Sequence, residues 1–145
     1  TNLELSRLLR KMAAAYTILG ENRFKVIAYE NAATAIEHAT SEMKDLYDDN
    51  KLDSVPGLGA SIRAHIAEIF KTGKSRHIDD VLSNVNPAIF SLLEVPGLGP
   101  KKAQRLVEKL NIKSAQRAVG ELEKAAKSNK IAQLEDFGEK VNWTF

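Results

Sequence analysis

Apolar residues recur along the chain at intervals of three and four positions, which is the spacing of a helix with one buried face. In the first such run, five large apolar residues follow this spacing: Leu5, Leu9, Met12, Tyr16 and Leu19. Thr1 and Glu4 have the spacing of a capping box, and Gly20 is a typical helix stop. The pattern therefore predicts a helix over residues 1–20 with these five side chains turned inward.

Similar runs predict further helices over residues 22–38, 42–47, 61–70, 78–82, 88–93 and 114–128, and another that begins at Pro100. Asn22 and Asn86 are suitable N-caps, and Pro87 suits the first position of a helix. In the second helix we expect six residues to face a core: Phe24, Ile27, Ala28, Ala32, Ala35 and Ile36. The whole pattern indicates an all-α protein.

A repeat organises these helices. The segment Val-Pro-Gly-Leu-Gly-Ala over residues 55–60 returns as Val-Pro-Gly-Leu-Gly-Pro over 95–100, and a degraded third copy follows over 134–140. Proline disfavours helix in the residue before it, and glycine allows a positive φ. Each copy therefore predicts a helix, a tight hairpin and a second helix, with the leucine of the hairpin held in the core. The third hairpin is truncated or degenerate, because Asp136 replaces its first glycine.

The two intact hairpins are candidate anion sites. Free amides at the start of a helix carry partial positive charge and bind phosphate readily. Lys101 and Lys102 follow the second hairpin directly, where cations oppose the helix dipole at a cost of about 0.3–1 kcal/mol each unless an anion joins them. The alternative is that each hairpin is only a connection between helices. A dinucleotide site is not expected, because no strand precedes either hairpin and no GxGxxG pattern occurs.

Composition narrows the class. The chain has 145 residues and no cysteine, which excludes disulfides, thiolate zinc sites and cysteine nucleophiles. No apolar run approaches the roughly 20 residues that span a bilayer, so we expect an intracellular protein without a membrane partner. The net charge is only +2, but residues 1–50 hold six Lys and Arg against eight Asp and Glu, whereas residues 51–145 hold fifteen against eleven. The excess of positive charge follows the repeats.

Three side chains outside the hairpins are candidates for chemistry. Lys25 and Tyr29 lie four residues apart, hence on one helix surface, and form either a solvated face or a basic and aromatic pocket for phosphate. His65 is a candidate base, but the sequence places no carboxylate or nucleophile with it. A lone histidine is more often structural or exposed to solvent.

Taken together, residues 23–33, the two hairpins and Thr72-Gly73-Lys74 resemble the amino-terminal region of family X DNA polymerases, which are similar to DNA polymerase beta. The resemblance covers nearly the whole chain. It implies two small helical lobes, each built around a helix-hairpin-helix motif. Residues 1–83 are similar to the lyase-type domain, and residues 84–145 are similar to the second helix-hairpin-helix domain.

The resemblance also implies roles for individual positions. The positions that match those binding the DNA backbone are Gly57, Gly59, Ser61, Gly97, Gly99, Lys101 and Lys102. Lys25 and Tyr29 match members of the pocket for a 5′-phosphate. Two sets of backbone carbonyls match sites for a monovalent cation, Na⁺ or K⁺: those of Asp53, Val55 and Leu58, and those of Leu93, Val95 and Leu98.

One departure from the family bears on catalysis. The position of the lysine that forms a Schiff base in the family's lyases is His65, and imidazole cannot form that imine. Lys25, Lys71 or Lys74 would have to replace it, so lyase activity is expected to be absent or weak. No palm domain with paired aspartates follows in this sequence, and polymerase activity is not expected of it.

The sequence therefore predicts a module that binds the sugar-phosphate backbone of gapped or nicked DNA without reading its sequence, as in base excision repair or gap filling. It uses no organic cofactor in this interpretation, and its further partners would be a polymerase or phosphoesterase domain or another repair protein. Two alternatives stay open: a 5′-deoxyribose-phosphate lyase with a non-standard lysine, and a helical module that docks on protein.

Overall fold

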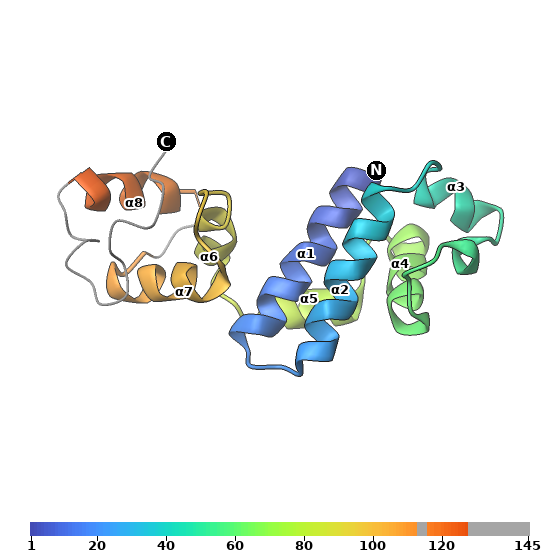
Figure 1. Ribbon diagram of the computed structural model, residues 1–145, viewed down its shortest axis with the longest axis horizontal. Coiled ribbons are helices and arrows are strands. Elements are labelled where there is room, and N and C mark those ends of the chain that lie inside the picture. Colours follow the sequence, from blue (N-terminus) through green and yellow to red (C-terminus); the bar gives the residue numbers. More distant parts are fainter. Residues whose placement is uncertain (113–115, 128–145) are drawn as a thin grey trace. The chain divides into compact units, whose positions relative to one another are not determined.

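The computed structural model describes residues 1–112 and 116–127, and within these ranges the secondary structure is entirely helical (Figure 1). The all-α prediction is confirmed. The contacts divide the chain into two compact units, Thr1–Asn84 and Val85–Phe145, which are called unit 1 and unit 2 below. The predicted third hairpin over 134–140 lies outside the described residues, as do residues 114, 115 and 128 of the last predicted helix.

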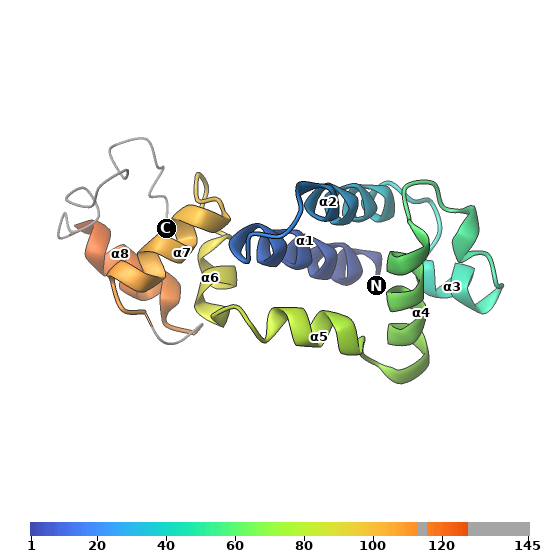
Figure 2. The ribbon, with the colours of Figure 1, turned by 90° about the horizontal axis from the view of Figure 1, so that it is seen from below.

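Unit 1 begins with two long helices, α1 (Asn2–Ile18) and α2 (Arg23–Glu37), which lie side by side in both views (Figures 1 and 2). The side chain of Thr1 accepts a hydrogen bond from the Glu4 amide, and that of Asn22 accepts one from the Phe24 amide. Of the five apolar residues predicted to face inward from α1, four are buried. Leu19 is 43 % exposed, because the helix ends at Ile18 and Leu19 follows it as the C-cap.

The prediction for the buried face of α2 was wrong in part. Phe24 is 81 % exposed, and Ile27 and Ala28 are exposed too. The buried residues of this helix are Tyr29, Ala32, Ala33 and Ile36, at spacings of three, one and three. At 100° per residue these four share one stripe toward α1, whereas Phe24 and Ile27 lie on the other side of the helix and Ala28 lies at the edge of the stripe.

The rest of unit 1 closes its core. It consists of α3 (Met43–Asp48), a 3₁₀ turn η1 (Leu52–Ser54), α4 (Ala60–Thr72) and α5 (Arg76–Leu82). Figure 2 shows α5 running along α1, which it contacts. Met43, Ile62, Ile66 and Ile78 join the buried residues of α1 and α2 in one hydrophobic cluster.

Unit 2 contains α6 (Pro87–Leu92), α7 (Pro100–Lys109) and α8 (Ala118–Lys127). As predicted, Asn86 caps α6 and Pro87 is its first residue. The α6 helix contacts both α7 and α8. Buried apolar residues of the other two helices are Ala103, Leu106 and Val107 in α7 and Ala118, Leu122 and Ala125 in α8. Across the ranges that the structure describes in both units, no helix is long and apolar enough to cross a membrane.

Candidate functional site

The two hairpins adopt the same backbone conformation. In the first hairpin Gly57 has φ +93° and in the second Gly97 has φ +89°. The second glycine of each is the N-cap of the following helix, Gly59 with φ −70° and ψ 163°, and Gly99 with φ −86° and ψ 175°. Leu58 and Leu98 are each only 6 % exposed, so the leucine of each turn is held in the core as predicted.

The paired glycines of each hairpin meet different requirements. Gly57 and Gly97 need glycine for their positive φ, and a Cβ on Gly57 would also lie 3.1 Å from the Cβ of Ala35. Gly59 and Gly99 have an extended backbone that any residue adopts, and a Cβ on either would meet no heavy atom of the described part of the chain within 4 Å. No contact within the described fold therefore requires glycine at positions 59 and 99.

The helices that follow the hairpins begin without a side-chain cap. Four other helices are capped by a side chain that accepts a hydrogen bond from the first turn, from Thr1, Asn22, Ser75 and Asn86. At α4 and α7 the N-cap is glycine, and no side chain of the described residues bonds the first-turn amides. Because Pro100 has no N–H, the amides at the start of α7 belong to Gly99, Lys101 and Lys102. Both helix starts thus present unpaired donors beside an open glycine.

The charge at these helix starts is suited to an anion. Neither α4 nor α7 has an acidic residue in its first turn. Ser61 and Lys101 are exposed, and Arg63 and Lys102 are partly exposed. The predicted backbone-binding residues of each hairpin therefore lie together, at one turn and the start of one helix. In each case the partial charge of the amides and the positive side chains have the same sign.

The carbonyls that precede α4 are open too. Those of Asp53, Val55 and Leu58 accept no hydrogen bond from the described residues. At the second hairpin the Val95 carbonyl accepts a hydrogen bond from the Leu98 amide at 3.2 Å, so this turn is closed more tightly. Such unpaired carbonyl oxygens are the hard ligands that a small cation requires.

Lys25 and Tyr29 do not form an exposed pair. Tyr29 is only 5 % exposed, and its ring packs edge-on against that of Tyr16 with centroids 5.4 Å apart. Burial raises the pKa of Tyr29, and the neighbouring Tyr16 adds to the rise. The Lys25 Nζ lies 5.8 Å from the centroid of the Tyr16 ring and 3.3 Å from the Glu21 carboxylate. Lys25 lies at the surface, whereas the side chain of Tyr29 is buried in the core.

His65 is not a lone histidine. Its ring stacks on that of His77 with centroids 4.6 Å apart and planes 8° from parallel. The Tyr16 hydroxyl and the His77 Nε2 form a hydrogen bond of 2.8 Å, and the Ser61 Oγ lies 3.4 Å from the His65 Nε2. Burial lowers the pKa of His65, and His77 lowers it further, against an opposing effect of Glu68. Sequence reasoning missed His77 and Tyr16, which come from different helices and share no periodicity with His65.

The other lysines proposed as nucleophiles lie elsewhere on unit 1. Lys71 is exposed in the last turn of α4, and Lys74 is exposed just after Gly73 ends that helix. Gly73 has φ +90° and bonds the Ile69 carbonyl, which gives α4 a left-handed C-cap. Neither lysine is part of the stack of His65 on His77.

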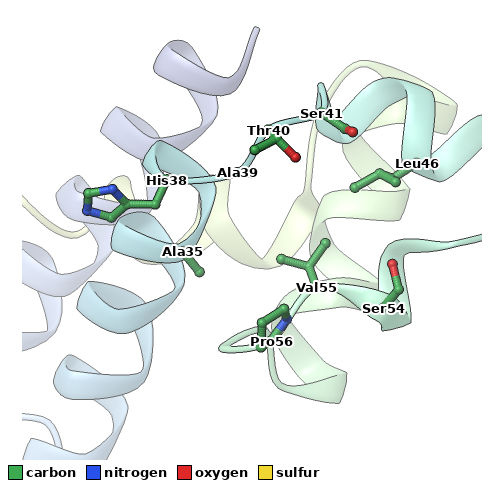
Figure 3. Close-up of a pocket in the computed structure, with 9 residues that line it drawn as sticks. All are labelled: Ala35, His38, Ala39, Thr40, Ser41, Leu46, Ser54, Val55 and Pro56. Carbon is green, nitrogen blue, oxygen red and sulfur yellow. The ribbon is translucent and has the colours of Figure 1, made fainter.

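A pocket of about 360 Å³ opens beside the first hairpin (Figure 3). Val55 and Pro56 of the hairpin, Ala35 of α2 and Leu46 of α3 supply apolar walls, and Thr40, Ser41 and Ser54 supply hydroxyls. No lysine, arginine or carboxylate lines it. The positive charge of unit 1 therefore does not gather in this pocket.

Comparisons with known proteins agree with the repeated geometry. Residues 1–75 match the helix-hairpin-helix domain family, and residues 49–113 and 89–141 match the SAM-like helix-hairpin-helix tandem. The chain is 31 % identical over 137 residues to the DNA polymerase/3′-5′ exonuclease PolX of Bacillus subtilis (strain 168), covering 94 % of this chain and 23 % of that protein.

Two similar relatives are called DNA polymerase lambda. The protein of Arabidopsis thaliana is 31 % identical over 109 residues, which are 74 % of this chain and 20 % of that protein. The protein of Rattus norvegicus is 27 % identical over 103 residues, which are 71 % of this chain and 17 % of that protein. The chain thus spans about a fifth of the length of the relatives it matches.

Proposed function

Because the chain belongs to the helix-hairpin-helix domain family and is homologous to the amino-terminal part of family X DNA polymerases, we propose that it binds DNA through backbone phosphates. One phosphate is held at the start of α4 and another at the start of α7. Amide and lysine contacts to phosphate carry no base information, so the binding does not depend on sequence.

The observation that carries this proposal is the open glycine at the head of each of the two helices. The described fold leaves space around Gly59 and Gly99 and makes no demand on their φ, yet both positions are glycine in matching conformations. A glycine that nothing inside the protein requires is typical of a place where another backbone approaches closely. Unpaired amides and the absence of first-turn acids at the same places favour a phosphate as that ligand.

A monovalent cation fits the first hairpin in this proposal. The carbonyl oxygens of Asp53, Val55 and Leu58 would hold it, because they accept no hydrogen bond from the described residues. The equivalent carbonyls of Leu93, Val95 and Leu98 would hold one at the second hairpin, with that of Val95 shared with an amide. Such a cation supplies positive charge beside a DNA phosphate.

A preference for gapped or nicked DNA follows from having one hairpin in each unit. Two separate contacts to the backbone allow the protein to hold both sides of a break, where the duplex bends easily. The names of the relatives, which are a DNA polymerase with 3′-5′ exonuclease and two DNA polymerases lambda, support a setting in DNA synthesis.

Removal of two positive charges from α7 tests the second hairpin. We expect Lys101→Ala with Lys102→Ala to lower affinity for duplex DNA at low salt about tenfold or more, because each lysine neutralises roughly one phosphate. The slope of log affinity against log salt should become shallower by about two. Fluorescence anisotropy of a labelled duplex at a series of salt concentrations measures both quantities.

The matched control removes the same charge from exposed positions in the last turns of α7 and α8, with Lys109→Ala and Lys124→Ala. It should leave the salt slope nearly unchanged. Equal losses of DNA affinity in the two double variants would mean that binding depends only on the net charge of the protein. An unchanged affinity in the Lys101 and Lys102 variant would point to hairpins that pack against protein instead.

A further inference from the structure

The pocket beside the first hairpin lies in unit 1 and has no part in the backbone contacts proposed above (Figure 3). Ala39, Leu46 and Val55 pack on the hydrophobic core of unit 1 and are only partly buried, so part of each side chain is open to the pocket. Figure 3 shows the side chains of Leu46 and Val55 turned toward one another, whereas the ring of His38 points away from both. The inner part of the pocket is therefore apolar.

The size and the polar groups of the pocket suit one apolar side chain. Its volume of about 360 Å³ is at the lower end of the range of about 300–1,000 Å³ that is usual for ligand sites. The Ser54 hydroxyl donates a hydrogen bond to the Lys51 carbonyl, and the Thr40 hydroxyl forms no hydrogen bond with the described residues. A charged group placed inside would lose its hydration without gaining a partner, because no charged side chain lines the pocket.

Three carboxylates stand next to the residues that line the pocket, and they are called the acidic rim below. Glu42 and Asp49 come four residues before and three residues after Leu46, hence on the same face of α3. Asp53 directly precedes Ser54, and all three acidic residues are exposed. Glu42 accepts a hydrogen bond from the Asn2 amide at 3.1 Å, whereas Asp49 and Asp53 pair with no cation of the described residues.

The segment that carries the acidic rim is negative as a whole. Residues 40–54 hold five Asp and Glu against two Lys. One of these lysines, Lys44, pairs with Asp48 at 2.6 Å, which leaves Lys51 as the remaining positive side chain of the segment. Carboxylates repel the phosphates of nucleic acids and of anionic lipids and attract cationic groups. The charge beside this pocket therefore favours a basic partner.

We propose that this pocket and its acidic rim dock a basic peptide segment of a partner protein. One apolar side chain of the peptide enters the space between Leu46 and Val55, and lysine or arginine side chains on either side of it meet the acidic rim. A buried apolar anchor with complementary charges around it is the usual arrangement of a protein interface. A small ligand confined to the apolar part would leave the carboxylates without a partner.

This inference goes beyond the proposed function and does not depend on it. The pocket uses the side chains of Val55 and Pro56, whereas the proposed phosphate contact uses the amides at the start of α4. The two sites therefore share the first hairpin but use different groups of it. Peptide binding requires no DNA, and DNA binding requires no peptide.

The test uses labelled synthetic peptides that have a central leucine, phenylalanine or methionine with two lysines on each side, and their binding to the whole chain is followed by fluorescence anisotropy. Replacing the central residue of the best binder by alanine should lower its affinity about tenfold, because the apolar anchor is lost. A peptide with glutamate in place of the lysines should not bind. Affinity should fall as salt rises, since the carboxylates of the acidic rim are exposed.

Variants assign the binding to this place. Thr40→Trp puts a large ring at the pocket from an exposed position and should lower peptide affinity about tenfold. Glu42→Gln with Asp49→Asn removes two charges of the acidic rim and should lower it about fivefold at low salt. Asp79→Asn with Asp80→Asn is the matched control, because it removes the same charge from exposed positions of α5, which contributes no residue to the pocket. It should leave peptide affinity unchanged.

A measurement on the unaltered chain avoids any effect of the variants on folding. In an NMR titration with the leading peptide, the amide shifts of residues 38–41, 46 and 54–56 should change most. Equal binding of the central-alanine peptide, or equal affinity in the Thr40→Trp variant, would overturn the inference. Shift changes centred on other residues, or equal losses in the two double variants, would overturn it as well.

The outcomes separate this inference from the proposed function. If DNA binds and none of the lysine peptides does, docking of a basic peptide is refuted while DNA binding by the hairpins stands. If the peptides bind as described and DNA does not, the proposed function fails while the docking site stands. Lys101→Ala with Lys102→Ala, the variant that tests DNA binding, should leave peptide affinity unchanged.

Discussion

Replacing Gly59 and Gly99 together by alanine should lower the affinity for duplex DNA about a hundredfold and leave both units folded. The added Cβ atoms enter space that no described atom occupies within 4 Å and that the proposal assigns to phosphate oxygens. A hydrogen bond to a charged group contributes about 1.5–3 kcal/mol, so losing one such contact at each hairpin corresponds to about tenfold or more per site. Titration of labelled duplex with the single and double variants measures the loss and its additivity.

Stability should change little in the same variants. The φ values of −70° and −86° suit alanine, and exchanging glycine for alanine at an N-cap costs about 1 kcal/mol or less. Gly120→Ala in α8 is the matched control, because a Cβ there also meets no atom of the described residues within 4 Å. It should leave DNA affinity unchanged and stabilise the helix by up to about 1 kcal/mol. Full DNA affinity in the Gly59 and Gly99 double variant would refute the assignment of this space to phosphate.

Gly57→Ala should instead destabilise unit 1, by about 3 kcal/mol. Two effects add: alanine is strained at φ +93°, and its Cβ would lie 3.1 Å from the Cβ of Ala35, which α2 holds in place. Urea unfolding followed by circular dichroism, together with hydrogen exchange of α2 and α4 amides, measures the loss and shows that it falls within unit 1.

Gly20→Ala separates these two effects. Gly20 has φ +74°, and its Cβ would meet nothing within 4 Å. Only backbone strain applies there, at about 1–2 kcal/mol. A loss for Gly57→Ala no larger than that for Gly20→Ala would mean that the hairpin does not press against α2 at Ala35.

The hairpins were predictable from the sequence because the proline and glycines of the repeat determine the local backbone conformation. Proline and two glycines at fixed positions leave few conformations, and the two turns accordingly agree within a few degrees at Gly57 and Gly97. Asn22 and Asn86 were likewise predicted as caps, since a short polar side chain before an amphipathic run has a local physical role. Turns and helix caps depend on residues close together in the sequence, so they could be predicted from it.

The rotation of α2 could not be inferred in the same way. This helix holds small and apolar residues on two sides, so its periodicity allowed Phe24 and Ile27 to face the core as readily as Tyr29. Packing against α1 determines which side of α2 is buried, because the Tyr29 ring packs edge-on against that of Tyr16. That contact joins residues of different helices and leaves no periodic signal within either one.

The stacking of His65 on His77 could not be predicted from the sequence for a related reason. His65 was judged as a single residue, because its stacking partner lies on the next helix and its nearest tyrosine lies on the first. Only the folding of α5 along α1 brings them together. Side chains that act through tertiary contact can be listed from a sequence, but their grouping depends on the packing of the helices.

DNA binding through the two hairpins is tested most directly by a titration of labelled DNA with the whole chain, comparing a duplex with a short gap and an intact duplex at two salt concentrations. We expect tighter binding to the gapped duplex, with an affinity for both that falls as salt rises, since phosphate contacts release counterions. Binding to gapped DNA no tighter than that of an unrelated protein of equal charge would contradict it.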